Sequence, residues 1–368
     1  MPKAITISQV DGKPGQVYYP LQITTVPNQT PSANQLLIKI SAAALNHRDL
    51  FIRQHLYPGL GFGIPLLADG CGTVTSTGSS AAAKAWAGKR VVVNPGTGWD
   101  TDPEGPEDKT GYKILGGTKM NPNGTLQEYM LVEASEVEEA PSHLSDVENA
   151  AIPLTGLTAW RAVMVKCGPQ NLKPGKNILV TGIGGGVALC ALEFARAAGA
   201  NVFVTSGSQE KIDKAIKLGA KGGVNYKEKD WDKKLKELLP KENKNLDCIV
   251  DGAGGDVVSK GAKLLKNGGI ISIYGMTVSP KMDFLMQAVL KNIEVKGSTM
   301  GSRKEFKDMI DFVKRTSASV PVSRVVKWDP SGDDIKDVDG LFEDMKKASQ
   351  FGKLVIEITG SSGGESKL

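Results

Sequence analysis

The chain has 368 residues, which is enough for about two domains of roughly 100 to 200 residues each. Its net charge is +5, and its densest charged run, 227–244, alternates in sign around apolar residues, which predicts a solvated helix face and no nucleic-acid partner. No apolar stretch reaches the roughly 18 residues of a membrane span, so we expect no membrane partner. The four cysteines are scattered, which favours free core residues over disulfides.

The order of predicted elements divides the chain into two parts. Short β-like runs at 4–7, 36–40, 72–75 and 90–93 predict a barrel-like domain, and residues 95–117 predict a long loop. From about Thr155 strands alternate with helices, which predicts an α/β, doubly wound parallel sheet. The predicted strands of that sheet are 178–180, 202–205, 223–226, 246–251 and 270–274. A helix at 306–314 and a strand at 353–359 indicate that the tail returns to the first domain.

A glycine-rich turn follows the predicted strand 178–180. Gly182, Gly184, Gly185 and Gly186 lead into a helical pattern that ends before Gly199. Such a turn lets backbone N–H groups approach a pyrophosphate at the start of a helix. The pattern from Gly182 is G-x-x-G-x-x-A, not the strict G-x-G-x-x-G. We expect a dinucleotide site, and a glycine-rich turn without a ligand is the alternative.

The end of the next strand bears on the choice of dinucleotide. An NAD site places an acidic residue about twenty residues beyond the glycines, where it binds the ribose 2′-hydroxyl. Here Thr205, Ser206, Gly207 and Ser208 lie at the end of the strand, with Lys211 shortly after, so hydroxyls and a cation stand where an NAD site has a carboxylate that would repel a 2′-phosphate. The sequence therefore predicts NADPH (NADP+). The alternative is that Ser206 and Lys211 only begin the next helix, as a cap and a solvated charge.

The sequence ends in Ser366-Lys367-Leu368 after a segment rich in glycine and serine. This C-terminal tripeptide is a peroxisomal import signal. A flexible segment before it would keep it accessible to the import receptor. We expect the peroxisomal import receptor as a partner and the peroxisome as the location, with the cytoplasm as the alternative.

Several segments together resemble the medium-chain dehydrogenase/reductase superfamily, in its zinc-free quinone-oxidoreductase-like and enoyl-reductase-like branch. They occur in this order: AALNHRDLFIR at 43–53, PLLADGCGTV at 65–74, GTLQEYMLV at 124–132, IPLTGLTAWRAV at 152–163, LVTGIGGGVAL at 179–189, GVNYKE at 223–228, DGAGG at 251–255, GGIISIYG at 268–275, KGSTMGSRKEF at 296–306 and GKLV at 352–355. The resemblance implies a discontinuous GroES-like catalytic domain (1–155 and 300–368), a Rossmann NADPH-binding domain (156–299), an active-site cleft at their junction and a homodimer.

Zinc-dependent members of this superfamily carry cysteine and histidine ligands that this sequence lacks. The resemblance places Asn46, Ala68 and Leu154 at the ligand positions, and only Asp69 remains as a possible ligand. Structural zinc sites also need clustered cysteines, and the loop 95–117 contains none. We therefore expect no metal. His47 is interpreted as a residue at the start of a helix.

The resemblance also implies which residues form the site. The expected cofactor-binding residues are Asn46, Thr158, Gly182, Gly184, Gly185, Gly186, Val187, Ala188, Ser206, Ser208, Lys211, Tyr226, Gly275, Met276, Thr299, Met300 and Gly301. The expected catalytic residues are Tyr57, as a proton donor, and Asn46, as a hydrogen-bonding partner of the cofactor or the substrate oxygen, with Asp49 fixing the loop. Core packing for Met276 and Met300, and turn packing for Tyr57, remain alternatives.

These residues predict a zinc-independent, NADPH-dependent quinone or alkenal reductase. Without a Lewis acid, hydride transfer is easier to a conjugated small-molecule substrate, such as a quinone, an enone, an enal or an enoyl thioester. One alternative is a carbonyl reductase or alcohol dehydrogenase. Another is a non-catalytic NADPH-binding protein, since a fold does not determine its function.

Overall fold

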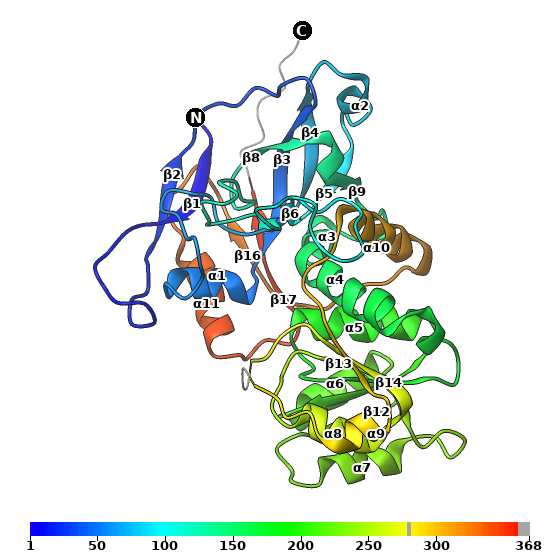
Figure 1. Cartoon of the computed structure of the whole chain (residues 1–368). Helices are drawn as coiled ribbons and strands as arrows, with labels where there is room; N and C mark the ends of the chain where they lie inside the picture. The colour runs from blue at the N-terminus through cyan, green and yellow to red at the C-terminus, as the bar shows by residue number, and fades with distance from the viewer. Residues whose placement is uncertain (278–280, 360–368) are drawn as a thin grey trace. The chain divides into compact units, whose positions relative to one another are not determined.

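The computed structural model describes residues 1–277 and 281–359, and these divide into two compact units (Figure 1). The first unit contains Met1–Leu154, Ser302–Lys314 and the described residues from Pro321 onward. The second contains Thr155–Gly301 and Arg315–Val320. The predicted import signal Ser366-Lys367-Leu368 lies outside the described residues.

The first unit is built on a seven-stranded sheet in the order β16-β17-β3-β4-β5-β9, with β8 also paired to β3. Strands β3 and β4 pair antiparallel and shift register twice, which bends the sheet. Alternate residues of β3, including Leu36, Ile38 and Ile40, are buried in the core of this unit. The C-terminal strand β17 pairs antiparallel with β3, so this late segment of the chain belongs to the sheet of the first unit.

The elements of the first unit in chain order are β1 (Lys3–Ile7), β2 (Leu21–Thr25), β3 (Gln35–Ala44), α1 (His47–Arg53), β4 (Asp69–Thr77), α2 (Ala81–Lys84), β5 (Arg90–Val93), β6 (Gly96–Thr97), β7 (Lys113–Ile114), β8 (Tyr129–Glu133), the 3-10 turn η1 (Ala134–Glu136), β9 (Val137–Glu139), α3 (Asp146–Ala150), α10 (Arg303–Thr316, whose last two residues belong to the second unit), β16 (Val322–Trp328), α11 (Lys336–Lys346) and β17 (Lys353–Ile358). The predicted loop 95–117 is irregular apart from the two-residue strands β6 and β7.

The second unit contains a six-stranded sheet in the order β12-β11-β10-β13-β14-β15, and every pairing in it is parallel. The chain runs outward from β10 to one edge, returns, and continues from β13 to the other edge. The predicted doubly wound parallel sheet is therefore confirmed. In such sheets ligands bind beyond the carboxyl ends of the strands where the order reverses, which here is between β10 and β13.

The elements of the second unit are α4 (Pro153–Trp160, whose first two residues belong to the first unit), the π-helix η2 (Arg161–Cys167), the 3-10 turn η3 (Pro169–Asn171), β10 (Asn177–Val180), α5 (Gly186–Ala197), β11 (Asn201–Ser206), α6 (Gln209–Lys217), β12 (Gly222–Asn225), α7 (Trp231–Leu238), β13 (Leu246–Asp251), α8 (Val257–Leu264), β14 (Leu265–Ile273), α9 (Met286–Leu290) and β15 (Glu294–Gly297).

Two further observations concern the described part of the chain. Cys71, Cys167, Cys190 and Cys248 are all buried and free. None of the helices described here combines the length and apolar character that a membrane span requires.

Candidate active site

The predicted glycine turn connects β10 to the start of α5. Gly182 and Gly184 have φ values of 65° and 125°, a region in which residues with a side chain are strained. A Cβ atom added to Gly182 or Gly185 would meet nothing within 4 Å, so there is open space beside the backbone at both positions. Gly185 is the N-cap of α5, and Gly186, Val187 and Ala188 form its first turn. Free N–H groups at such a helix start can hold a pyrophosphate.

The residues predicted to bind the 2′-phosphate come together at the end of β11. The Lys211 side chain crosses the glycine turn, because a Cβ on Gly184 would lie 2.9 Å from its Cδ and 3.5 Å from its Nζ. The hydroxyl of Tyr226 lies against Gly207, 2.9 Å from the position of an added Cβ. The two serines are engaged locally: Ser206 Oγ accepts the Ser208 N–H, and Ser208 caps α6.

A buried hydrogen bond crosses the point where the sheet order reverses. Thr181, after β10, donates its hydroxyl to the Asp251 carboxylate at the end of β13, at 2.5 Å. Asp251 also accepts the N–H groups of Ala253 and Gly254. Burial raises the pKa of the Asp251 carboxyl above its ordinary value. This network fixes the loop after β13 beside the glycine turn.

The residues expected beside the nicotinamide fall in two places within the second unit. Thr158 of α4 donates a hydrogen bond from its hydroxyl to the Met300 sulfur at 3.6 Å. Met300 is buried, and Thr299 and Gly301 are its neighbours in the chain. Gly275 follows β14 and lies against Gly252, since an added Cβ would be 3.3 Å from the Gly252 carbonyl oxygen. Met276 is 42% exposed, which disfavours core packing for this side chain.

A buried polar cluster in the first unit surrounds Asp69, the first residue of β4. The Lys353 ammonium donates to Asp69 Oδ2 and to Asn46 Oδ1, each at 2.7 Å. The Asn46 amide donates to Asp69 Oδ2 at 3.0 Å, and the Leu154 backbone N–H donates to Oδ1 at 2.6 Å. Asn46 and Leu154, which the resemblance places at zinc-ligand positions, therefore both donate to the Asp69 carboxylate. Lys353 donates to it as well.

The predicted proton donor Tyr57 is connected to this cluster through α1. Its ring lies under the Arg48 guanidinium, 4.6 Å from the ring centroid. Arg48 donates to the Leu115 and Gly116 carbonyls and pairs with Asp49, which accepts the Asn46 backbone N–H at 2.7 Å. Asp49 thus fixes the start of α1.

The donor set around Asp69 does not fit a zinc ion. Zinc sites use cysteine, histidine and carboxylate ligands, usually four. Here the oxygens of Asn46 and Asp69 already face the Lys353 ammonium, which would repel a second cation. Across residues 1–277 and 281–359, no group of three or more His, Cys, Asp or Glu residues could hold a metal.

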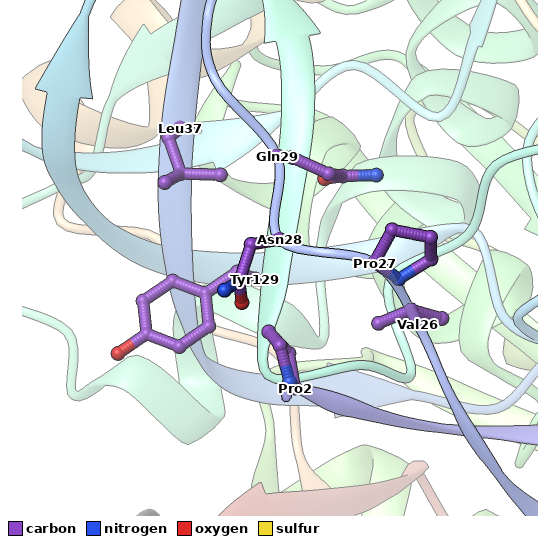
Figure 2. A pocket seen from close by; sticks show the side chains of 7 residues that line it. All are labelled: Pro2, Val26, Pro27, Asn28, Gln29, Leu37 and Tyr129. Carbon is purple, nitrogen blue, oxygen red and sulfur yellow. The ribbon is translucent and has the colours of Figure 1, made fainter.

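A separate pocket of about 320 Å³ lies in the first unit (Figure 2). It is lined by Pro2, Val26, Pro27, Asn28, Gln29, Leu37 and Tyr129. None of the predicted site residues lines it.

A doubly wound parallel sheet with a glycine-rich turn before a helix, in one chain with a domain built on a bent, mostly antiparallel sheet, is typical of a nicotinamide-dependent dehydrogenase. Residues 32–142 match the family described as alcohol dehydrogenase GroES-like domain, and residues 186–315 match zinc-binding dehydrogenase. The chain belongs to the medium-chain dehydrogenase/reductase superfamily, with the GroES-like and Rossmann domains that the sequence predicted. It is an oxidoreductase of that type with a nicotinamide cofactor.

Similar proteins carry alcohol-dehydrogenase names. The chain is 50% identical over 363 residues to zinc-type alcohol dehydrogenase-like protein YogA of Leptosphaeria maculans, covering 97% of this chain and 100% of the relative. It is 31% identical to zinc-type alcohol dehydrogenase-like protein C1773.06c of Schizosaccharomyces pombe, covering 90% and 92%. A crystal structure of an NAD-dependent alcohol dehydrogenase superposes with a TM-score of 0.80 at 29% identity, covering 97% of this chain and 100% of that one.

Three site residues were not predicted from the sequence. Lys353 belongs to the GKLV segment, and a lysine directly before the apolar run Leu354–Ile356 was the available signal. Arg48 lies over the Tyr57 ring, but a charged residue in the first turn of a helix is normally a solvated one and gave no signal of this contact. Lys227 lies beside Tyr226, with its Cε 2.8 Å from a Cβ placed on Gly207, and it adds a second cation near the predicted 2′-phosphate position.

The titration of the Asp49 carboxyl tests the buried arrangement of Asn46, Arg48 and Asp49 at the start of α1. Burial raises the pKa of the Asp49 carboxyl from 3.8 to about 6, against the opposing effect of Arg48. The folded protein thus holds this proton more tightly than the unfolded chain, and the free energy of unfolding should fall by up to about 3 kcal/mol between pH 4 and 6. Asp49→Asn should flatten that part of the profile in denaturant titrations. The exposed Asp337→Asn should leave it unchanged, and an unaltered slope in Asp49→Asn would contradict the assignment.

Proposed function

We propose that this protein is a zinc-independent, NADPH-dependent oxidoreductase that transfers hydride to a conjugated acceptor, such as a quinone, an enone, an enal or an enoyl thioester. The Asn46–Asp69–Lys353 cluster carries this proposal, because it supplies hydrogen-bond donors where a metal would need ligands. Reduction of an isolated ketone concentrates negative charge on one oxygen, for which a Lewis acid is the usual partner. A conjugated acceptor spreads this charge and can be stabilised by hydrogen bonds.

The chemistry requires one hydride and one proton. When bound, the reduced nicotinamide supplies the hydride to the β-carbon of the acceptor. The carbon–carbon π pair then moves to form an enolate, whose oxygen accepts a hydrogen bond from Asn46. Tyr57 or a water molecule donates a proton to the α-carbon, and this step forms the saturated product. For a quinone, the proton goes to oxygen instead.

The NADPH preference is supported by charge at the end of β11. No acidic residue follows β11 before α6, and Lys211 lies across the glycine turn with Lys227 and Tyr226 beside Gly207. A cation near the ribose favours a 2′-phosphate, whereas an aspartate or glutamate would favour its hydroxyl.

The second candidate is a carbonyl reductase or alcohol dehydrogenase. It is favoured by the names of similar proteins, one of them 50% identical to this chain. The donor set around Asp69 disfavours it, because that set offers no Lewis acid. A non-catalytic NADPH-binding protein is the third candidate, and only an assay separates it from the others.

The deciding experiment is steady-state oxidation of NADPH and NADH by the purified protein with its metal content measured. The substrates are a quinone, an enal, an enoyl thioester and a plain ketone. We expect turnover with NADPH on at least one conjugated acceptor and none on the ketone. Turnover on the ketone alone would favour the second candidate, and tight NADPH binding without turnover would favour the third.

Lys211→Glu should weaken NADPH binding about 10- to 100-fold and NADH binding much less, because the lost contact is to the 2′-phosphate. Dissociation constants from cofactor fluorescence give the comparison. Lys217→Glu makes the same charge change at the exposed end of α6 and is the control. Equal losses for both cofactors in Lys211→Glu would rule out the phosphate contact.

Tyr57→Phe should lower kcat about 100-fold with little change in the Kd of NADPH, because it removes only the phenolic proton. Both constants are measured on the best conjugated substrate. Tyr129→Phe, in the separate pocket, is the control and should keep wild-type turnover. If Tyr57→Phe also keeps it, Tyr57 is a packing residue and water is the donor.

We also propose a homodimer formed through the edge of the second unit's sheet. Strand β15 is the outermost strand beside β14, and it and the neighbouring α9 segment expose apolar side chains. These are Phe284, Leu285, Met286, Val289, Leu290 and Val295. An edge strand with an apolar surface favours pairing with a second copy related by two-fold symmetry.

Light scattering during size-exclusion chromatography tests the dimer. The wild-type protein should have twice the chain mass, and Val289→Glu combined with Leu290→Glu should shift it toward the monomer. Leu238→Glu is the control, because it adds a charge to an exposed leucine of α7, which packs near the opposite edge of the sheet. A monomeric wild type, or a double variant that stays dimeric, would contradict this interface.

A further inference from the structure

The hydrogen bonds around Asp69 determine which groups of the cluster remain available to a ligand. Asn46 Oδ1 faces the Lys353 ammonium, which fixes the orientation of the amide, since a reversed amide would set two donors against each other. One Asn46 amide N–H then points to Asp69. An amide has two N–H donors, so one remains. Asn46 can therefore offer a ligand only a donor.

Burial makes this arrangement persistent. The side chains of Lys353 and Asp69 are 3% and 0% exposed, and Asn46 is 5% exposed. A buried charge is retained only when it is paired and hydrogen-bonded. Asp69 receives three donors, and two of the three N–H groups of the ammonium have acceptors, so each charge is paired within the cluster.

We propose that Lys353 is the buried cation of this active site in place of a metal ion, and that it positions Asn46 as a hydrogen-bond donor to the carbonyl oxygen of the substrate. The ammonium holds the amide oxygen, and the free amide N–H then meets the oxygen on which negative charge develops. Lys353 is a positioning residue and Asn46 the catalytic one. This inference rests on the proposed reduction of a conjugated acceptor and assigns the group that binds its oxygen.

A purely structural ion pair makes a different prediction. Buried ion pairs can often be replaced by neutral groups of similar volume without loss of stability. If Lys353 and Asp69 only hold the fold together, neutralising both should leave an active enzyme. If Lys353 positions Asn46, the neutral pair should fold but leave the amide free to turn.

The first test is the double variant Lys353→Met/Asp69→Asn, compared with Lys353→Arg, which keeps the charge. We expect the double variant to keep its thermal midpoint, to lose about 100-fold in kcat, and to change KM less than about threefold. Lys353→Arg should recover to within about tenfold of the wild type. A folded double variant with kcat within threefold of the wild type would overturn the proposal.

A second variant covers the case in which the double variant does not fold. Asn46→Leu removes the donor and leaves the Lys353–Asp69 ion pair in place. It should show the same loss of kcat at nearly unchanged KM. Wild-type turnover in this variant would also overturn the proposal.

The third test needs no substrate, so it tests whether Lys353 stands in place of a metal even if the wild-type protein reduces none of the acceptors. The wild type, treated with a chelator and dialysed, is titrated with Co²⁺ and separately with Zn²⁺. We expect no stoichiometric binding and no visible cobalt absorption band. One equivalent of metal bound in the wild type and lost in Asn46→Leu would show that a metal, not Lys353, is the cation of this site.

Discussion

The buried carboxylate of Asp69 is the constraint on which the first unit's site depends. A carboxylate removed from water must be paired and hydrogen-bonded, so the groups that satisfy it are held in place. These groups are the Lys353 ammonium, the Asn46 amide and the Leu154 N–H, which come from β17, the start of α1 and the start of α4. One charge therefore joins segments up to 284 residues apart.

In the second unit the corresponding constraint is the reversal of strand order. In such sheets the ligand binds in the crevice beyond the carboxyl ends of the two strands at the reversal. Asp251 and Thr181 connect β13 and β10 at this point, beside the open backbone of Gly182 and Gly185. The backbone of the turn can thus approach a pyrophosphate while the loop around it stays fixed.

Family membership and site chemistry answer different questions about this protein. The relatives are named for zinc and for alcohol dehydrogenation, and the family explains the fold. The reaction depends on which groups face the substrate, because one fold can carry several chemistries. Here the ammonium, the amide and the carboxylate bond to one another, and the proposed hydrogen bond from the remaining Asn46 N–H to the substrate oxygen needs no metal.

The sequence alone was sufficient for the two-part plan, the parallel sheet, the glycine turn, and the lack of an acidic residue between β11 and α6. Periodicity and glycine placement report local burial and backbone conformation, which neighbouring residues determine. The Asn46–Asp69–Lys353 cluster was decided only by tertiary structure. Lys353 and Asn46 are 307 residues apart, and they meet because β17 pairs with β3. No local pattern encodes that pairing, since it depends on the order of strands in the completed sheet.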